Sequence, residues 1–280
     1  MKIKKTFMMH LTVSIVTYKN NILQLQRAVN CVAESPCVEK IYIIDNSPSN
    51  QLREITFLSE KIEYIFNNKN LGYGRANNIA LENSIKNGVN YHLVLNPDIY
   101  FEKGVIEELY DFMEKNPDVG LVMPKILYPD GSLQYLCKLL PTPLDLIRRR
   151  FLPGNIFSKQ NSFYELRFAG YNKIMDVPYL SGCFMFIRTE ALRRVGLFDE
   201  QFFMYLEDAD ISRRIHKHYR TVYYPKVFGF HEYEKGSYRN SKLLKYHLFS
   251  AFRYFNKWGY FFDKDRREIN QKVLEKLNAL

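Results

Sequence analysis

The chain has 280 residues and a formal net charge of +10, from 40 Lys and Arg against 30 Asp and Glu. This length is enough for one large domain or two small ones with a full hydrophobic core. No window approaches the roughly 18 apolar residues of a membrane-spanning helix, and the polar residues between Phe7 and Val16 argue against a signal peptide. The four cysteines form no CxxC pair, so we expect neither a zinc site nor a disulfide framework, and a cytoplasmic protein.

The positive charge is confined to the C-terminal part of the chain. Residues 1–211 contain 24 basic and 24 acidic side chains, whereas residues 212–280 contain 16 and 6. This asymmetry indicates an anionic partner for the C-terminal part, which could be nucleic acid, a phospholipid surface or a phosphorylated substrate.

Apolar strands alternate with helices along the N-terminal part. Leu11–Tyr18, Lys40–Asp45 and Ile62–Phe66 are apolar and rich in β-branched or aromatic residues, and a helical pattern runs from Leu23 to Val32. This alternation predicts an α/β fold in which helices cover both faces of a mostly parallel sheet.

Two glycines mark the next segment, NNKNLGYGRANN at residues 67–78. Gly72 and Gly74 allow a tight turn before a helix that we expect to run to about Lys86. The spacing is neither GxGxxG nor a P-loop, which argues against dinucleotide-binding folds and P-loop enzymes. Asp45 and Arg75 could both face a nucleotide; the alternatives are a helix cap for Asp45 and a surface charge for Arg75.

The segment Tyr91–Phe101 places an acid at the end of a buried strand. Its apolar start predicts a strand covered on both faces, and Pro97 must end the ladder because it cannot donate. Asp98 then lies at the carboxyl end of a central strand, where open α/β sheets bind ligands and a carboxylate can hold a hard cation. The alternative is that Asp98 caps the helix that begins near Gly104.

The middle of the chain has the weakest periodicity. After a helix at Glu102–Glu114 and a strand at Val119–Tyr128, the segment Leu139–Ile174 carries prolines, the basic run Arg148–Arg150 and many aromatic residues. We expect a long irregular loop, and its aromatic content favours a flap over a site rather than disorder.

Three acids follow an aromatic run in the stretch Phe198–Ile215. We expect Glu207, Asp208 and Asp210 to open a helix, whose dipole favours each acid by about 0.3–1 kcal/mol. The dipole alone explains the cluster poorly, because the preceding run Phe202–Tyr205 forms an apolar wall that would raise the pKa of a carboxyl group.

The chain ends with a strand at Thr221–Phe230, then His231, then an amphipathic helix. A single histidine is more often structural than a ligand. The helical period over Lys242–Phe262 sorts basic and apolar side chains onto two faces, so this helix either packs on the domain or lies at a membrane surface. The basic face holds Lys242, Lys245, Arg253 and Lys257, and the apolar face holds Leu244, Leu248, Ala251, Phe255 and Trp258.

Taken together, these stretches resemble the family-2 glycosyltransferases of GT-A fold, especially the bacterial rhamnosyltransferase-like members. The resemblance runs from Leu11 to about Lys257 and rests on an ordered set: VSIVTY, IIDNSPS, NNKNLGYGRANN, LVLNPDI, YLSGCFMFIR, GLFDEQFFMYLEDADISRRI and the histidine after the last strand. It implies an inverting enzyme that uses Mg²⁺ or Mn²⁺ and transfers a sugar, first of all rhamnose from dTDP-rhamnose, to a saccharide acceptor.

The resemblance also assigns site residues. Asp208 matches the catalytic base, with Glu207 or Asp210 beside it to position the acceptor or the loop. Asp98 stands at the last acid of the Asp-x-Asp metal motif and His231 at a further metal ligand, whereas Asn96 replaces the first acid of that motif and removes a negative charge. The residues expected at the nucleotide-sugar are Thr17, Tyr18, Asp45, Arg75, Asn77, Asn78 and Asn96.

The expected organisation is a GT-A catalytic domain at residues 1–240, with a nucleotide-sugar part at about 1–130 and an acceptor-side part at about 131–240, followed by a basic amphipathic helical segment at 241–280. If this segment meets an anionic leaflet, the enzyme is a peripheral protein on the inner face of the cell membrane, and its acceptor a polyprenyl-diphosphate-linked saccharide for a surface polysaccharide. The alternatives are a UDP-hexose or UDP-N-acetylhexosamine donor, a nucleotidyltransferase, or a nucleic-acid-binding protein, although no nucleic-acid motif is present and we expect no nucleic-acid partner.

Overall fold

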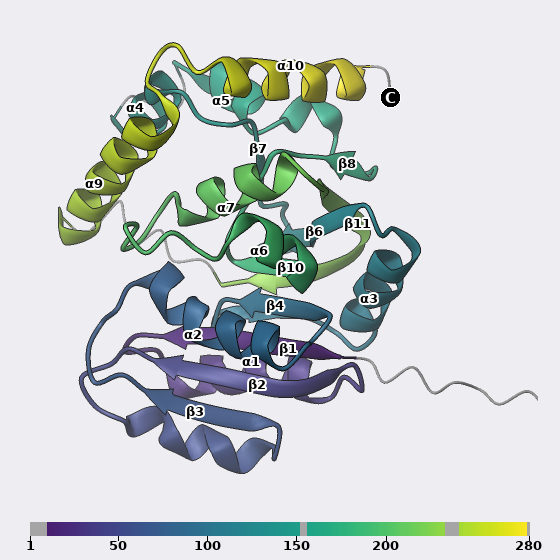
Figure 1. Cartoon of the computed structure of the whole chain (residues 1–280), viewed down its shortest axis with the longest axis vertical. Helices are drawn as coiled ribbons and strands as arrows, with labels where there is room; N and C mark the ends of the chain where they lie inside the picture. The colour runs from purple at the N-terminus through teal and green to yellow at the C-terminus, as the bar shows by residue number, and fades with distance from the viewer. Residues whose placement is uncertain (1–9, 152–155, 233–240, 279–280) are drawn as a thin grey trace, which may run out of the picture.

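The computed structural model describes residues 10–151, 156–232 and 241–278. Within these residues nine strands form one sheet in the order β3-β2-β1-β4-β10-β6-β11-β5, with β8 beside β11, and β7 and β9 form a separate pair. Helices flank the sheet along its length (Figure 1). Most paired residues lie in parallel ladders, and the predicted α/β fold with a mixed, mostly parallel sheet is confirmed.

The first four strands are parallel, so their carboxyl ends meet at one edge of the sheet. Alternate residues of β2 point to opposite faces: Ile41 and Ile43 belong to the core cluster that contains α1, whereas Tyr42 and Ile44 pack with α2. These two helices therefore cover opposite faces. The elements are β1 (Leu11–Thr17), α1 (Ile22–Ala33), β2 (Val38–Asp45), the 3-10 helix η1 (Gln51–Leu58), β3 (Ile62–Phe66), α2 (Tyr73–Lys86) and β4 (Tyr91–Leu95).

The second half of the sheet is mixed. Strand β10 runs antiparallel to both β4 and β6, β11 is parallel to β6, and the two-residue strands β5 and β8 pair with β11 in antiparallel fashion. The strands are β5 (Ile99–Tyr100), β6 (Val119–Leu127), β7 (Cys137–Lys138), β8 (Met175–Asp176), β9 (Tyr179–Leu180), β10 (Phe184–Arg188) and β11 (Arg220–His231), and the helices among them include α3 (Val105–Lys115), α6 (Thr189–Val195) and α7 (Glu207–His216).

The segment predicted as an irregular loop is largely helical instead. It contains α4 (Pro143–Phe151), α5 (Ser158–Tyr164) and the 3-10 turn η2 (Arg167–Ala169). The backbone N–H of Asp145 donates to Thr142 Oγ1 at 3.2 Å, and the N–H of Thr142 donates to Asp145 Oδ2 at 2.9 Å, so this reciprocal pair caps α4. Pro143 stands at the first helical position, where its fixed φ and missing N–H cost nothing, so the proline that indicated a loop begins a helix.

Two C-terminal helices, α9 (Ser241–Trp258) and α10 (Lys264–Asn278), pack on the second half of the molecule (Figure 1). A buried ion pair holds them: Arg213 of α7 donates to both carboxylate oxygens of Asp263, at 2.6 and 2.7 Å. The Asn270 side chain adds hydrogen bonds to the backbone N–H and C=O of Leu140. The basic C-terminal segment is therefore docked through specific polar contacts.

The two predicted faces of α9 are only partly correct. Phe255 is buried as expected, but Leu248 is exposed, together with Phe249 and Phe252, at 64% and 60% exposure. Lys257 turns back to the protein and pairs with Asp199 and Asp210 instead of joining a free basic face. No helix among the described residues is long and apolar enough to cross a membrane.

Candidate active site

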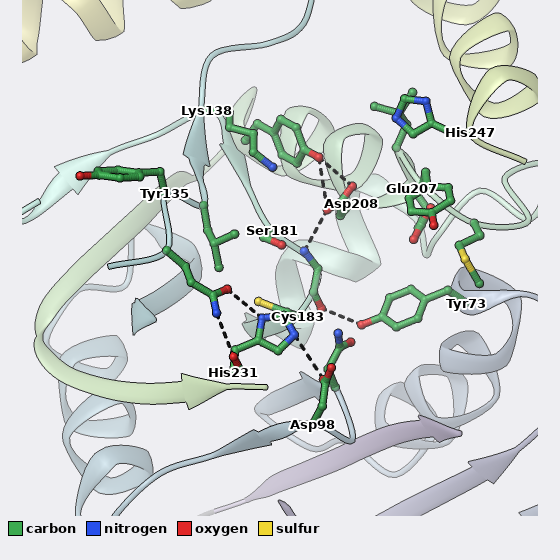
Figure 2. A pocket seen from close by; sticks show the side chains of 18 of the residues that line it. Tyr73, Asp98, Tyr135, Lys138, Ser181, Cys183, Glu207, Asp208, His231 and His247 are labelled. Carbon is green, nitrogen blue, oxygen red and sulfur yellow. Dashed lines mark hydrogen bonds and ion pairs between the residues drawn. The ribbon is translucent and has the colours of Figure 1, made fainter. Parts of the chain in front are cut away.

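A cavity of about 910 Å³ lies at the carboxyl ends of β1 and β4 and is also lined by α4, β9 and the start of α7. Parallel strands direct their end residues to this edge, which explains why side chains distant in sequence meet here. Figure 2 shows the strand-end pair Asp98 and His231 on one side and Asp208 and Glu207 on the other. Seven of the predicted site residues line the cavity: Thr17, Tyr18, Asn96, Asp98, Glu207, Asp208 and His231.

The pairing of β5 with β11 brings Asp98 to His231. Pro97 ends β4, the chain turns, and Ile99 then pairs with His231 across the ladder. Asp98 Oδ1 lies 3.3 Å from His231 Nε2. Asp98 does not cap α3, because the N-cap is Gly104, with φ +95° and no side-chain hydrogen bond. The strand-end interpretation of Asp98 is thus favoured over the helix cap.

Gln134 orients His231 through two hydrogen bonds. Gln134 Oε1 lies 3.0 Å from His231 Nδ1, and Gln134 Nε2 donates to the backbone carbonyl of His231 at 2.9 Å. With Nδ1–H donated to Gln134, Nε2 faces Asp98. Such an outer partner fixes the ring and the tautomer of a metal-binding histidine, and the sequence pattern did not reveal it.

The Asp98–His231 pair fits one side of a divalent-cation site. Asp98 Oδ1 is buried and accepts no hydrogen bond of acceptable geometry from the described residues, which suits a metal ligand. Burial lowers the pKa of His231, but its contacts with Asp98 and Cys183 outweigh this and bring the pKa to about 10, so a bound cation would displace a proton. The described residues hold no group of three or more His, Cys, Asp and Glu that could bind a metal. The remaining ligands would therefore be diphosphate oxygens and water, as is usual for Mg²⁺.

Asp208 is held by three donors in the first turn of α7. The backbone N–H of Gly182 donates to Oδ2 at 3.0 Å, and the N–H of Ala209 donates to Oδ1 at 2.9 Å. The Tyr179 hydroxyl lies 3.2 and 3.4 Å from the two oxygens. Asp208 is half-buried and lines the cavity, so a fixed carboxylate faces the space where a substrate hydroxyl could bind.

Glu207 is the acid that the apolar surroundings perturb. It is 6% exposed, and its Oε2 has no hydrogen-bond partner among the described residues. Burial, followed by the nearby charge of Asp208, raises the pKa of Glu207 well above its ordinary value. Glu207 therefore keeps its proton to a higher pH than an exposed glutamate does, and its Oε2 is free of hydrogen bonds to the described residues.

The backbone that leads into α7 is strained. Tyr205 and Leu206 both adopt the left-handed region, with φ +72° and +66°, which is uncommon for residues with bulky side chains. This segment docks on the glycine turn, because the Tyr73 N–H donates to Phe203 O at 2.9 Å. A Cβ on Gly72 would lie 2.3 Å from that same oxygen, so only glycine fits there. Strain of this kind is typical of functional sites.

Four residues expected at the nucleotide-sugar do not line the cavity. Asp45 is fully buried and accepts hydrogen bonds from Ser47 N and from the Tyr64 hydroxyl. Arg75 is exposed and lies 3.4 Å from Glu200. Asn77 and Asn78 are buried in internal hydrogen bonds, to the Ser14 hydroxyl and to the backbone of Phe198. Their roles at the nucleotide-sugar remain predictions.

Asp210 serves the packing of the C-terminal helices. Its Oδ1 accepts from Trp258 Nε1 at 2.8 Å and lies 2.9 Å from Lys257 Nζ, while Oδ2 accepts from Arg214 at 2.8 Å. It is fully buried and does not line the cavity. Of the two helpers considered beside Asp208, the geometry thus favours Glu207.

Several cationic and aromatic residues of the cavity carried no sequence signal. Lys138 is 9% exposed, with Nζ 4.8 Å from the centroid of the Tyr179 ring. Arg149 and Arg150 come from the basic run on α4, the one part of this group that the sequence had marked. All three line the cavity, together with Arg167, Tyr73 and His247.

The fold is that of GT-A glycosyltransferases. The structure is similar to the crystal structure of GalNAc-T7 with UDP, GalNAc and Mn²⁺, with a TM-score of 0.65, 17% identity, and coverage of 98% of this chain and 52% of that chain. It is also similar to S. aureus TarS, with a TM-score of 0.56, 14% identity, and coverage of 89% and 40%. The predicted GT-A fold is confirmed.

Residues 12–196, more than half of the chain, match the family model described as Glycosyl transferase family 2. The chain belongs to this family, as its motifs predicted.

The curated relatives are modest in identity. The low-salt glycan biosynthesis hexosyltransferase Agl10 of Haloferax volcanii is 29% identical over 217 residues, which are 76% of this chain and 64% of that protein. The N-acetylglucosaminyl-diphospho-decaprenol L-rhamnosyltransferase of Mycobacterium tuberculosis is 30% identical over 175 residues, 58% and 56% of the two chains. The rhamnosyltransferase WbbL of Escherichia coli is 28% identical over 224 residues, 77% and 81%. The chain spans less than two thirds of the length of the first two.

Proposed function

We propose that the protein is an inverting glycosyltransferase that moves a sugar, in the first place rhamnose from dTDP-rhamnose, to a saccharide acceptor. The observation that carries the proposal is that the Asp98–His231 pair and the Asp208 carboxylate face one cavity at the strand ends. The names of the M. tuberculosis and E. coli relatives support rhamnose, and the name of Agl10 supports a hexose more broadly.

The donor would bind with its nucleotide against the ends of β1 and β4, where Thr17, Tyr18 and Asn96 line the cavity. Asp98 and His231 would hold Mg²⁺ or Mn²⁺, which when bound neutralises the charge of the departing diphosphate. Because Asn96 replaces the first acid of the metal motif, Asp98 and His231 would be the two side chains that bind the metal ion. We propose that four residues outside the cavity act on the donor side by supporting the residues that line it. They are Asp45, Arg75, Asn77 and Asn78.

In the proposed transfer step, Asp208 acts as the general base and accepts one proton. The acceptor hydroxyl loses its proton to Asp208 as its oxygen attacks the anomeric carbon from the face opposite the diphosphate. The bond between the anomeric carbon and the diphosphate oxygen breaks, and the nucleoside diphosphate leaves with that electron pair. The hydrogen bonds from Gly182, Ala209 and Tyr179 would keep the carboxylate aimed at the acceptor, and Glu207 would help to position the acceptor.

We further propose that residues 1–240 form the catalytic domain, with the donor part at about 1–130 and the acceptor part at about 131–240, and that residues 241–280 attach it to a membrane. Helix α9 exposes Leu248, Phe249 and Phe252 beside Lys245 and Arg253. An exposed apolar row flanked by cations suits an anionic lipid surface. This would place a cytoplasmic enzyme on the inner face of the membrane, near a polyprenyl-diphosphate-linked acceptor.

A panel of nucleotide-sugars tests the proposal. With Mn²⁺ present, dTDP-rhamnose should raise the melting temperature and release dTDP, and both effects should disappear in chelator. Release of UDP from UDP-glucose, UDP-galactose or UDP-N-acetylglucosamine instead would identify a different donor, while the proposed type of reaction would stand. Formation of a nucleotide-sugar from a nucleoside triphosphate would make the protein a nucleotidyltransferase, and binding of labelled single-stranded DNA at physiological salt would favour nucleic acid.

A further inference from the structure

One wall of the cavity is built from cations. We define this basic wall as Lys138, Arg149, Arg150 and Arg167, which come from β7, α4 and η2 and all line the cavity. Two carboxylates of the cavity act on this wall: Glu165 pairs with Arg149 at 2.9 Å and with Arg167 at 2.5 Å, and Asp208 acts on Lys138 without forming an ion pair. Cations therefore outnumber acids on the wall.

Lys138 is the most unusual member. It is 9% exposed, and no carboxylate of the described residues lies within ion-pair distance of its Nζ. Its ammonium group lies over the Tyr179 ring instead, at 4.8 Å from the centroid. Burial and then the charge of Arg149 lower the pKa of Lys138, while the carboxylates of Asp208 and Glu165 favour its charged form from beyond ion-pair distance. A buried cation that makes no direct ion pair is costly, and an anionic ligand would stabilise it. On α9, burial and then the charges of Arg150, Arg149 and Lys138 lower the pKa of His247 to about 4.

Lys138 lies at the Asp208 end of the cavity. Figure 2 shows it above and to the left of Asp208, whereas Asp98 and His231 lie below Asp208. Tyr179 connects Lys138 to Asp208, since its ring contacts the lysine and its hydroxyl contacts the carboxylate. If Asp208 receives the proton of the acceptor hydroxyl, a group bound just beyond Asp208 belongs to the acceptor.

We propose that the basic wall binds a phosphate or diphosphate group carried by the acceptor, so that the acceptor is a glycosyl diphosphate rather than a neutral sugar. This inference rests on the proposed transferase function, because that function identifies the acceptor side of Asp208. Arg149 and Arg150 supply planar donors suited to phosphate oxygens, and Lys138 supplies a point charge. On the same helix, α4, Leu144, Ile147 and Phe151 are exposed to solvent, which suits an acceptor that continues into a lipid chain.

The test measures binding of inorganic pyrophosphate to the full chain by calorimetry, in EDTA and at fixed ionic strength. EDTA prevents Asp98 and His231 from holding the anion through a metal. We expect Lys138→Met and Arg150→Gln each to weaken binding at least about 10-fold, because each removes a charge-assisted contact. Lys264→Gln, which removes an 88% exposed charge on α10, is the matched control and should change binding less than about two-fold.

The fold of each variant is checked by its melting temperature; Met has nearly the volume of Lys, and Arg150 gives a second, independent variant. Absence of pyrophosphate binding to the wild type, or equal binding in Lys138→Met and Arg150→Gln, would overturn the proposal.

Two further titrations assign the anion to the acceptor. Saturating dTDP should leave pyrophosphate affinity unchanged, whereas competition would give the basic wall to the donor and refute the proposal. Farnesyl diphosphate should bind to the same residues, and its exclusion would rule out a diphosphate ester. Failure of the transferase function itself would appear separately, as no nucleotide release from any nucleotide-sugar while pyrophosphate binding persists.

Discussion

Asp208→Asn separates the role of this carboxylate in chemistry from its role in packing. Asn has one acceptor oxygen, so either the Gly182 or the Ala209 N–H, now at 3.0 and 2.9 Å from different oxygens, loses its partner. An unsatisfied buried donor costs about 1–3 kcal/mol of stability, which leaves most of a typical domain stability intact. The loss of a general base lowers turnover by about 10²–10⁴-fold.

The assay pairs calorimetry of the nucleotide-sugar with turnover on the same Asp208→Asn protein. Donor affinity should change less than about threefold, because the proposed base acts on the acceptor and contacts no part of the nucleotide. Asp210→Asn is the matched control: it lies in the same helical turn but serves α9, so it should lose stability and keep most of its turnover. Loss of donor binding and turnover together in Asp208→Asn, or equal turnover loss in both variants, would refute the assignment.

Three further predictions concern the buried acid Glu207, the ion pair that anchors the C-terminal helices and the exposed face of α9. Burial raises the pKa of Glu207, so the folded state holds a proton that the unfolded chain has released, and the free energy of unfolding falls as pH rises above the ordinary pKa of Glu. Glu207→Gln should therefore match the wild type in urea unfolding near pH 4 and exceed it at pH 8, by up to about 1.4 kcal/mol per pH unit; a pH-independent difference would contradict this. Asp263→Ala leaves buried Arg213 uncompensated and should cost about 3–5 kcal/mol in the same measurement, whereas a loss below about 1 kcal/mol would show that the C-terminal helices are not anchored there. In flotation with vesicles, binding should need anionic lipid, weaken with salt and fall in the Phe249→Ser, Phe252→Ser double variant; binding that ignores salt, or none at all, would remove the membrane role.

The sequence predicted the strands and their end residues well because both are local properties. An apolar β-branched run and a proline that stops it place Asp98 at a strand end without knowledge of the fold. The contact between Asp98 and His231 could not be predicted from local sequence, because it depends on the pairing of the two-residue strand β5 with the end of β11. Only the resemblance to the family predicted that these two residues share a site, because hydrophobic periodicity carries no information on such a contact.

Other features depended on tertiary packing and had no local signal. Asp208 and Asp210 stand in one helical turn of α7, and only the docking of α9 assigns Asp210 to Trp258 and leaves Asp208 to the cavity. Lys138 lies in a two-residue strand, and nothing in its neighbours indicates that it is buried beside the candidate base. Helix α4 was missed because Pro143 was interpreted as a loop residue rather than as the first residue of a helix.

The central claim is that the Asp98–His231 pair holds a cation that binds the diphosphate of the donor. Titration of dTDP-rhamnose into the wild type by calorimetry, with Mn²⁺ and then with EDTA, tests it most directly, beside Asp98→Ala and the control Asp199→Ala, which removes an acid outside the cavity. The account predicts that EDTA and Asp98→Ala each weaken donor binding at least about 10-fold, and that Asp199→Ala binds as the wild type does. Donor affinity that is unchanged in EDTA and in Asp98→Ala would contradict the account.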